Sequence, residues 1–288
     1  FSLTIEGYFS VRNFINIIYH SVFIGLLAIA ESYCLISGNL DLSVESVAAF
    51  GAMLSAWLCG TSNFASGLQL NSFVVLALMI LMGGVVGVIN GLFVLKLRIH
   101  SFLVTLSTYI IVRGIAVLLT GGHGVSQIPP AFTFIDRLRV FRIMPVIVFI
   151  MITFYAFFHF VLQRTRLGKH IFIIGGNIST AFNFGIKVHE VLFIVFIFSG
   201  ALSGLSGWLI TARAGGATSS IAAGFLFETL AAVVIGGVSL TGGFGSLVGV
   251  FAGVLILSSI RSALNILAIS PFITEVIRGL LVLIAIVL

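Results

Sequence analysis

Apolar runs with few charges follow one another along the whole chain, and this pattern limits the fold more than any other feature. A helix needs about 20 apolar residues to cross a bilayer, with a range of roughly 17 to 25. Nine stretches are candidates: 13–36, 44–60, 71–95, 99–120, 144–162, 189–212, 225–238, 245–266 and 271–288. Because a helix satisfies its backbone hydrogen bonds internally, the sequence predicts an all-α fold, a polytopic transmembrane helical bundle with about nine spans.

The composition agrees with a membrane protein. Of the 288 residues, 60% are hydrophobic and 8% are charged, whereas a soluble domain carries about 25% charged residues. We therefore expect a single transmembrane domain over residues 1–288. The net charge of +6 does not predict a nucleic-acid partner, because basic residues in the loops between apolar runs are explained by the positive-inside rule.

Two of the nine stretches are short for a complete span. The stretch 225–238 falls below the usual length and 44–60 is marginal. Short apolar segments flanked by glycine are typical of broken or re-entrant helices, which often line a transport pathway. A tilted neighbour in a locally thinned bilayer is the alternative, and the sequence leaves both interpretations open.

Basic residues in the loops predict the orientation. The segment 163–188 is the longest break between apolar runs that carries charge of one sign. Its basic residues are Arg164, Arg166, Lys169 and Lys187. This loop and the 95–99 turn, with Lys96 and Arg98, are expected in the cytoplasm. Strict alternation places 121–143 outside despite its three arginines, and it leaves the start of the chain outside, which implies an additional first helix and ten spans in a full chain.

The loop 163–188 also contains signals for a short helix. Asn177 follows two glycines and is a suitable N-cap. The residues 178–184 then form about two turns, and Gly185 stands where a C-terminal capping glycine is usual. We expect a small helix on the inner face of the membrane that a soluble partner contacts, so that 163–188 acts as a cytoplasmic coupling loop.

Glycine recurs at a four-residue period in several spans. The repeats are Gly83, Gly87 and Gly91; Gly245, Gly249 and Gly253; and Gly200 and Gly204. Small residues at this spacing let helix backbones approach closely within lipid. The pattern predicts helix contacts and carries no information about the transported solute.

Asp41 is a candidate functional residue in the segment GNLDLSVES. It lies between two predicted spans, so its charge is expected to remain unburied, and together with Ser43 it is placed to cap a helix that starts near Val44. The functional alternative is that Asp41 and Glu45 belong to an inner gate or contact a partner.

Six charged residues fall within or at the ends of spans: Glu31, Arg113, Glu228, Arg261, Glu275 and Arg278. Charges at the centre of a membrane helix cost about 2.5 to 3.5 kcal/mol on insertion scales, so each is expected to pair or to face a wet cavity. Glu275 and Arg278 are spaced to pair on one helix face. Arg113 has no acid nearby and must reach another helix or a cavity, and Glu228 is the sharper pathway candidate because its span is short.

The remaining polar positions and the absent motifs bear on chemistry. Asn90 and Asn265 lie in apolar helices and are expected to form interhelical hydrogen bonds. The sequence has no G-x-x-x-x-G-K-[ST] loop for nucleotide, no Cys and His set with metal spacing and no nucleophile elbow. We therefore expect neither a metal site nor an enzyme.

Several motifs resemble those of one transport family. The segments TRLGKHIFIIGGN (165–177) with FGI (184–186), SGNLDLSV (37–44), ETLAAVVIGGVSLTGGFGS (228–246), and ALNILAISPF with RGL (278–280) occur in order along the chain. They are similar to motifs of the membrane permeases of ATP-binding-cassette (ABC) importers for ribose, arabinose, xylose and galactose. The segments ISPF and ISGNLDLSVES look nearest to arabinose-type members. The sequence departs from the family pattern at Asn39, Glu45, Thr180 and Phe182.

The resemblance implies a function and partners. The chain would be a permease subunit, paired with a second identical or related copy, that passes a monosaccharide from a periplasmic sugar-binding protein to the cytoplasm by alternating access. A separate ABC ATPase would hold ATP and Mg²⁺, so this chain would bind no cofactor itself. The implied location is the bacterial inner membrane, where lipid surrounds the spans.

The resemblance, together with the residue patterns, selects two groups of candidate residues. For coupling to the ATPase they are Arg166, Gly168, Lys169, Gly175, Gly176, Asn177 and Gly185. For the translocation path or gates they are Asp41, Ser43, Glu228, Gly236, Gly237, Gly242 and Gly243. The glycines are included because broken helix ends bend most easily at glycine.

Two alternatives remain at this stage. One is an ABC permease for another small solute, such as a nucleoside, a furanosyl signalling molecule or a branched-chain amino acid. The other is an ion-coupled carrier or a channel, which would need a relay of buried acids or histidines. Glu31 and Glu228 would be at most the first two members of such a relay.

Overall fold

The computed structural model describes residues 8–140 and 142–270, together with 273, 274, 276, 277, 279, 280 and 283. Within these residues the helices are α1 (Val11–Ile36), α2 (Val44–Cys59), α3 (Ser72–Leu95), α4 (Ser101–Leu118), α5 (Pro130–Arg137), α6 (Val146–Arg164), α7 (Arg166–Gly176), α8 (Ile178–Asn183), α9 (Val188–Ala214), α10 (Phe225–Ile235) and α11 (Leu247–Ile266). The strands β1 (Arg139–Val140) and β2 (Met144–Pro145) form a small antiparallel hairpin. The predicted span 271–288, with Glu275 and Arg278, lies largely outside the described residues.

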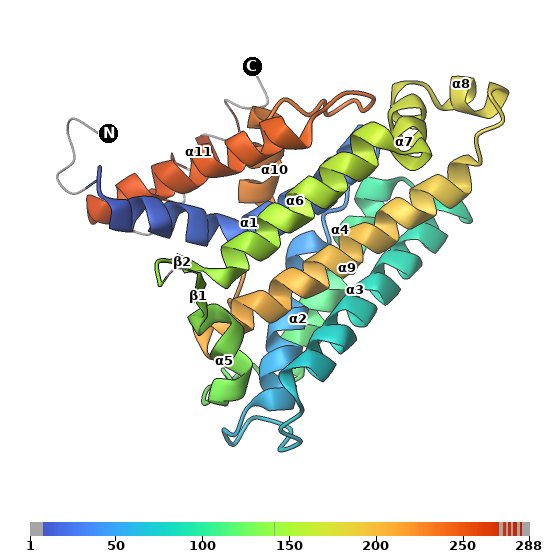
Figure 1. Cartoon of the computed structure of the whole chain (residues 1–288). Coiled ribbons are helices and arrows are strands. Elements are labelled where there is room, and N and C mark those ends of the chain that lie inside the picture. Colours follow the sequence, from blue (N-terminus) through green and yellow to red (C-terminus); the bar gives the residue numbers. More distant parts are fainter. Residues whose placement is uncertain are drawn as a thin grey trace.

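The predicted helical bundle is confirmed in its general form (Figure 1). Among the described residues, six helices are long and apolar enough to cross a membrane: α1, α3, α4, α6, α9 and α11. The helices α2 and α10 are apolar but shorter. The expected number of about nine spans is not confirmed by the described residues and stays a prediction.

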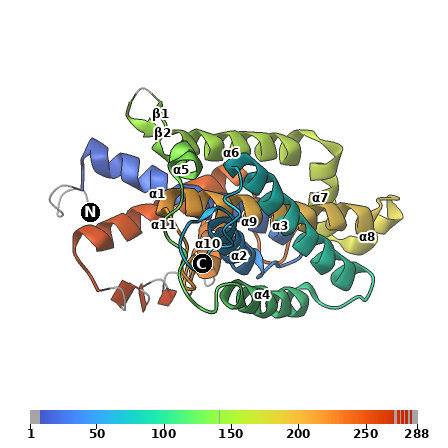
Figure 2. The same ribbon diagram turned by 90° about the horizontal axis from the view of Figure 1, so that it is seen from below.

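Helix α9 runs through the middle of the bundle, with α3 beside it and α2 and α1 packed against it (Figures 1 and 2). The glycines explain the closeness of α3 and α9. A Cβ atom added at Gly83 would collide with the Gly200 carbonyl oxygen, and one added at Gly87 would collide with the Phe196 carbonyl oxygen. The predicted role of the glycine repeats in helix contacts is confirmed for these two helices.

The bundle has two ends that matter for function. At one end, called here the α7–α8 end, lie the loop 37–39, the 95–101 turn and the start of α9, because all of them line one cavity with α7 and α8. At the opposite end, called the α5 end, the loop that follows α4 pairs with the segment after α9, where Val125 and Ala217 form an antiparallel bridge.

Helices α2 and α10 both start within the bundle. The loop that leads to α2 bends back along α4, where Leu40 N–H donates to Ser101 Oγ (3.2 Å) and Leu42 N–H donates to Thr105 Oγ1 (3.1 Å). The segment before α10 also turns inward and reaches Arg113 on α4. This arrangement favours broken helices over tilted neighbours as the reason for the two short spans.

Candidate functional site

Three glycine-containing segments meet at the α7–α8 end. Gly243 N–H donates to the Ile36 carbonyl oxygen (2.9 Å). A Cβ atom added at Gly175 would lie 2.6 Å from Gly243 N, and one added at Gly242 would lie 2.9 Å from the Cα of Gly38. We call Gly38, Gly175, Gly176, Gly242 and Gly243 the glycine junction. Sequence reasoning assigned Gly175 to coupling and Gly242 to the path, and the structure brings the two together.

Positive φ angles reinforce the need for glycine at the junction. Gly38, Gly242 and Gly243 have φ angles of +79°, +89° and +73°, in the left-handed region that residues with a Cβ disfavour. The junction ties α7 to the end of α1 and to the loop that joins α10 and α11. Helix α7 is therefore in close backbone contact with both.

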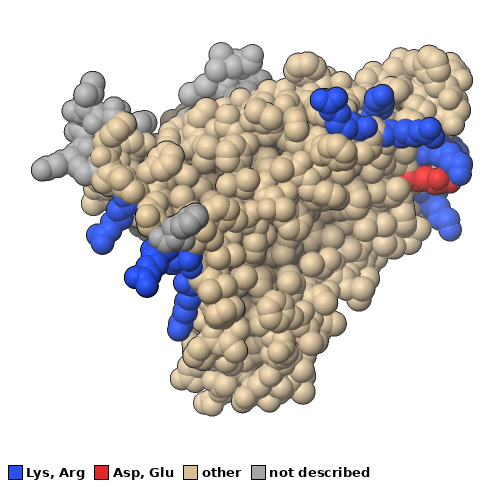
Figure 3. Space-filling model, in the orientation of Figure 1, with Lys and Arg blue, Asp and Glu red and all other residues tan. Residues whose placement is uncertain are grey.

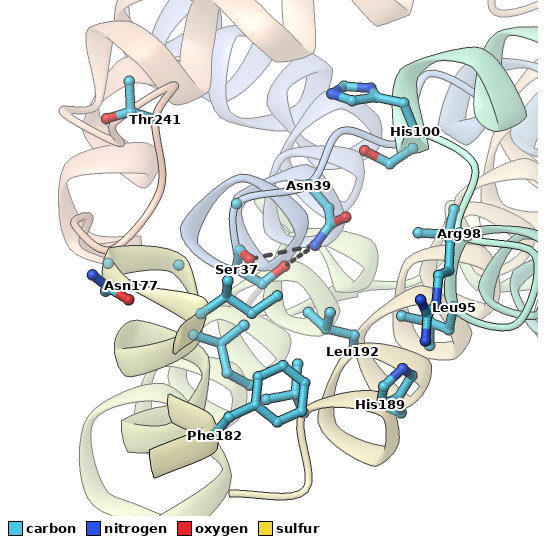
Figure 4. A pocket seen from close by; sticks show the side chains of 18 of the residues that line it. Ser37, Asn39, Leu95, Arg98, His100, Asn177, Phe182, His189, Leu192 and Thr241 are labelled. Carbon is cyan, nitrogen blue, oxygen red and sulfur yellow. Dashed lines mark hydrogen bonds between the residues drawn. The ribbon is translucent and has the colours of Figure 1, made fainter. Parts of the chain in front are cut away.

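A cavity of about 690 Å³ opens beside the junction (Figure 4). Its polar lining includes Asn39, Arg98, His100, Asn177 and His189. The Asn39 amide donates to the carbonyl and hydroxyl oxygens of Ser37, at 3.3 Å each, as the dashed lines in Figure 4 mark. The cavity lies between the coupling loop and the first residues of α4 and α9.

The coupling loop contains two helices, whereas the sequence predicted one. The missed helix, α7, begins at the Thr165 N-cap, whose hydroxyl accepts from Gly168 N–H (3.3 Å). The face of α7 that points into the protein carries a buried residue at every third position: Gly168, Ile171 and Ile174. Gly168 is required there because a Cβ atom would collide with the Leu162 backbone.

The predicted helix after Asn177 is confirmed. The Asn177 side chain accepts from Thr180 N–H (2.9 Å) at the start of α8. Gly185 follows the helix with a φ angle of +71°, as expected for a terminating glycine. Helix α8 ends at Asn183, one residue before the predicted end.

Basic side chains surround these two helices. Arg166 and Lys169 are exposed on the first turn of α7, and Lys187 pairs with Glu190 at 2.9 Å on the surface. Blue side chains gather at this end in Figure 3 and also on the side of the β1–β2 hairpin. The α7–α8 end therefore offers positive charge to a partner.

The expectation that Asp41 stays unburied is wrong. Asp41 is 1% exposed because the loop after α1 turns back into the bundle. Its carboxylate accepts from the Ser43 N–H (3.0 Å), the Ser43 hydroxyl (2.5 Å) and the Ser199 hydroxyl (2.6 Å). The capping prediction also fails, because the Ser43 side chain makes no cap hydrogen bond to α2. Burial raises the pKa of Asp41, and the hydrogen bonds from Ser199 and Ser43 oppose that rise.

Asn90 joins the same buried cluster. Its amide nitrogen donates to the Ser43 hydroxyl (3.0 Å), and its oxygen accepts from the Thr108 hydroxyl (2.6 Å). The predicted interhelical role is confirmed for Asn90, which links the start of α2 to α3 and α4. Asn265 is exposed at the end of α11. Glu31, fully buried near Asp41, adds a second acid to this region.

The charge in the short span pairs across helices. Glu228 on α10 accepts from Arg261 on α11 at 3.1 Å, and the Glu228 side chain is 8% exposed. Gly236 lies at the end of α10, where a Cβ atom would be 2.5 Å from the Cα of Val250 on α11. Gly237 turns the chain with a φ angle of +81°. Glu228 and Gly236 therefore hold α10 against α11, and Gly237 begins the loop between them.

The sequence reasoning missed Ser199, Thr108 and Tyr109 as partners in the buried polar region. The repeat SGALSGLSG in α9 places Ser199, Ser203 and Ser206 among small residues, and all three are fully buried. Hydroxyl-bearing residues within a glycine-spaced helix were the available signal. Among the residues that the structure describes, no group of three or more His, Cys, Asp or Glu side chains is placed to hold a metal ion.

Comparison with known proteins extends over nearly the whole chain. The family model described as branched-chain amino acid transport system / permease component matches residues 13–286. The chain is 32% identical to the ribose import permease protein of Haemophilus influenzae, over 99% of this chain and 87% of the relative. It is 31% identical to the L-arabinose ABC transporter permease protein of Azospirillum brasilense (99% and 82%). It is 33% identical to the D-allose transport system permease protein of Escherichia coli (100% and 86%). No solved structure matches.

These findings confirm the resemblance drawn from the motifs. The similar identities to ribose, arabinose and allose permeases do not favour the arabinose type, which stays a prediction. The described part of the chain includes six helices that can span a bilayer, and the chain is an integral protein of the inner membrane. It belongs to the family of permease components described as branched-chain amino acid transport system / permease component.

Proposed function

We propose that this chain is the permease subunit of an ABC importer and that it carries a monosaccharide into the cytoplasm. The observation that carries this proposal is its identity of 31% to 33% to permeases named for ribose, L-arabinose and D-allose, over 99% or more of the chain. The family is one of permease components, and ATP hydrolysis belongs to a separate subunit.

The geometry of the α7–α8 end supports the proposed coupling. Arg166 and Lys169 present exposed positive charge on α7, and the glycine junction connects α7 to α1 and to the loop after α10. Binding of ATP to the partner ATPase would displace α7 and α8, and the junction would pass that displacement to the spans. A sugar-binding protein outside, a second permease copy and the nine-span arrangement complete the proposal.

A second candidate solute has one specific observation in its favour. The description of the matching family model names branched-chain amino acids, which are apolar and zwitterionic rather than rich in hydroxyl groups. Such a solute would need a separate binding protein of different specificity, while the coupling would be unchanged.

Uptake by reconstituted vesicles tests the proposal. The purified chain is combined with a partner ATPase and, in parallel samples, with a sugar-binding protein or a leucine-binding protein. The entry of radiolabelled ribose, arabinose, allose and leucine is then followed with and without ATP. We expect entry of one of the sugars that requires ATP and both partners. Uptake of leucine in place of sugar would move the function to the second candidate. Uptake by the chain alone on an ion gradient would overturn the ABC assignment.

A further inference from the structure

Two side chains hold the chain where α10 begins. Glu45, the second residue of α2, accepts from Leu226 N–H (2.9 Å) through one carboxylate oxygen and from the Tyr109 hydroxyl (3.2 Å) through the other. Arg113 on α4 donates to the Ile221 carbonyl oxygen (2.8 Å). We call Glu45, Tyr109 and Arg113 the clamp and residues 221–226 the re-entrant turn.

Glu45 is the buried member of the clamp, whereas Tyr109 and Arg113 are partly exposed. Tyr109 is halfway along α4, and Glu45 is 3% exposed. The Leu226 N–H is one of the backbone donors at the start of α10 that have no partner within the helix, so Glu45 supplies the negative charge that a helix N-terminus favours. The opposite charges of Glu45 and Arg113 face the turn from two helices and reduce the cost of burying each.

Arg113 also indicates which side of the bundle is wet. It is partly exposed in the second half of a membrane-spanning helix, and an arginine at such a depth faces a cavity or another protein rather than lipid. Phe227, directly after the re-entrant turn, is 59% exposed. The surface that carries Arg113 and the start of α10 is therefore a better candidate for the path than the apolar outer faces of α3 and α4.

The backbone of the turn is conformationally unusual. Ala222 and Gly224 have positive φ angles of +60° and +83°, and the Cβ atom makes the left-handed region unfavourable for alanine. Such strain persists where the surroundings fix the backbone. Arg113 donates to the Ile221 carbonyl oxygen before Ala222, and Glu45 accepts from Leu226 N–H after Gly224, so the two hydrogen bonds bracket the strained residues.

Helix α10 is packed tightly on one side. It contacts α11 through backbone approaches at Gly236, Gly249 and Gly253, where a Cβ atom would collide with the facing helix, and Glu228 adds the ion pair to α11. Toward α2 and α4 the turn makes the hydrogen bonds of the clamp, and Ile221 packs against the apolar cluster that contains Met53 and Ala116. A relative movement of α10 with α11 against α2 with α4 would therefore pass through the clamp.

We propose that Glu45 and Arg113 are positioning residues of the translocation gate, and that the clamp holds the re-entrant turn across the path until coupling releases it. The loop after α10 reaches the glycine junction through Gly243, so a displacement of α7 has a continuous route to the turn. This inference rests on the proposed transport function.

Thiol labelling of the assembled complex tests the clamp. Cys34 and Cys59, both buried, are replaced by Ala, and Phe227→Cys provides an accessible probe beside the turn. Labelling by a membrane-impermeant maleimide and the ratio of ATP hydrolysed to solute imported are measured in vesicles. For Glu45→Gln we expect about tenfold faster labelling at rest and a higher ratio, because one charge-assisted hydrogen bond is lost. Tyr109→Phe keeps the bond to Leu226 and should give a smaller change of the same sign.

Controls separate this inference from the proposed function. Ser107→Ala removes an exposed hydroxyl on α4 that donates to the Leu103 carbonyl oxygen of the same helix and should change neither readout. The double variant Glu45→Gln, Arg113→Gln should be less affected than the sum of the single variants, because each charge loses its counterpart. If Glu45→Gln and Arg113→Gln change neither the labelling rate nor the ratio of ATP hydrolysed to solute imported, the proposed role of the clamp in the gate is wrong. If Glu45→Gln fails to insert, Tyr109→Phe decides by the same labelling. A parent complex that imports no solute contradicts the proposed function, while its labelling at rest still tests the clamp.

Discussion

Asn90 shows how one amide can organise the start of a broken helix. Its nitrogen and oxygen bind hydroxyl groups on two different segments, Ser43 before α2 and Thr108 on α4. The Asn90 amide is fully buried and Ser43 is 1% exposed, so water does not substitute for the hydrogen bond between them. The position of α2 in the bundle thus depends on a side chain from α3.

Replacing Asn90 should therefore weaken the bundle. For Asn90→Leu we expect the free energy of unfolding to fall by about 1 kcal/mol. Interhelical hydrogen bonds in membranes contribute about 0.6 kcal/mol on average and at most about 1.7 kcal/mol to that free energy. The measurement is the unfolding of the detergent-solubilised protein in increasing SDS, followed by circular dichroism. Asn265→Leu is the matched control, because Asn265 is exposed. Equal stability of the two variants would show that the Asn90 contacts contribute nothing.

Residue-level prediction succeeded where the signal was local. Asn177 and Gly185 were identifiable because a helix cap needs an acceptor at one end and a left-handed residue at the other. Asp41 was misplaced because its burial depends on Ser199, 158 residues away. Glu45 was noticed as a gate candidate, but its bond to Leu226 spans 181 residues, and no short-range pattern specifies such a pair.

At the scale of helices, α3 and α9 form the closest described contact in the bundle core. The carbonyl oxygens of Gly200 and Met79 occupy the space that Cβ atoms would need at Gly83 and Gly204. Helices in lipid associate through such close contact rather than through hydrophobic burial. A single methyl group at the crossing point therefore has a large effect.

Neighbouring glycines of α3 give a sharp test of this contact. Gly83→Ala should destabilise the protein by about 1 to 3 kcal/mol, the usual cost of overpacking, because the methyl group meets the Gly200 backbone. Gly84→Ala meets no atom within 4 Å and should leave stability unchanged or slightly increased. Thermal unfolding of both variants in detergent measures the difference. Equal midpoints would mean that α3 and α9 separate without cost.

Helix boundaries were predictable from apolar length. Eight of the nine predicted stretches coincide with helices to within about three residues, since polar residues and glycines end the apolar runs. Helix α7 was missed because its basic residues and its two final glycines resemble a loop, while its buried face contains only three residues. Contact with Leu162 and with the glycine junction, rather than hydrophobic length, determines its place.

At the scale of the whole molecule, positive charge lies at both ends. The α7–α8 end has Arg166 and Lys169, and Arg137 is exposed on α5 at the other. The positive-inside rule alone does not decide the orientation, because the basic residues at each end would place that end in the cytoplasm. The α7–α8 end differs because its charged helix α7 is in close backbone contact, at the glycine junction, with the end of α1 and with the loop that joins α10 and α11.

Charge reversal at each end separates the two roles. Arg166→Glu with Lys169→Glu should abolish binding of the partner ATPase while the chain still inserts, because repulsion would replace the attraction that we propose between these basic side chains and the ATPase. Arg137→Glu reverses an exposed charge at the α5 end and should leave ATPase binding unchanged. Co-purification of the ATPase from membranes measures binding, and protease accessibility confirms insertion. If the complex survives the double reversal, α7 is not the contact. If Arg137→Glu abolishes binding instead, the α5 end faces the cytoplasm and the predicted orientation is inverted. The glycine junction would then lie at the outer face, and it could not pass a movement of the ATPase to the spans.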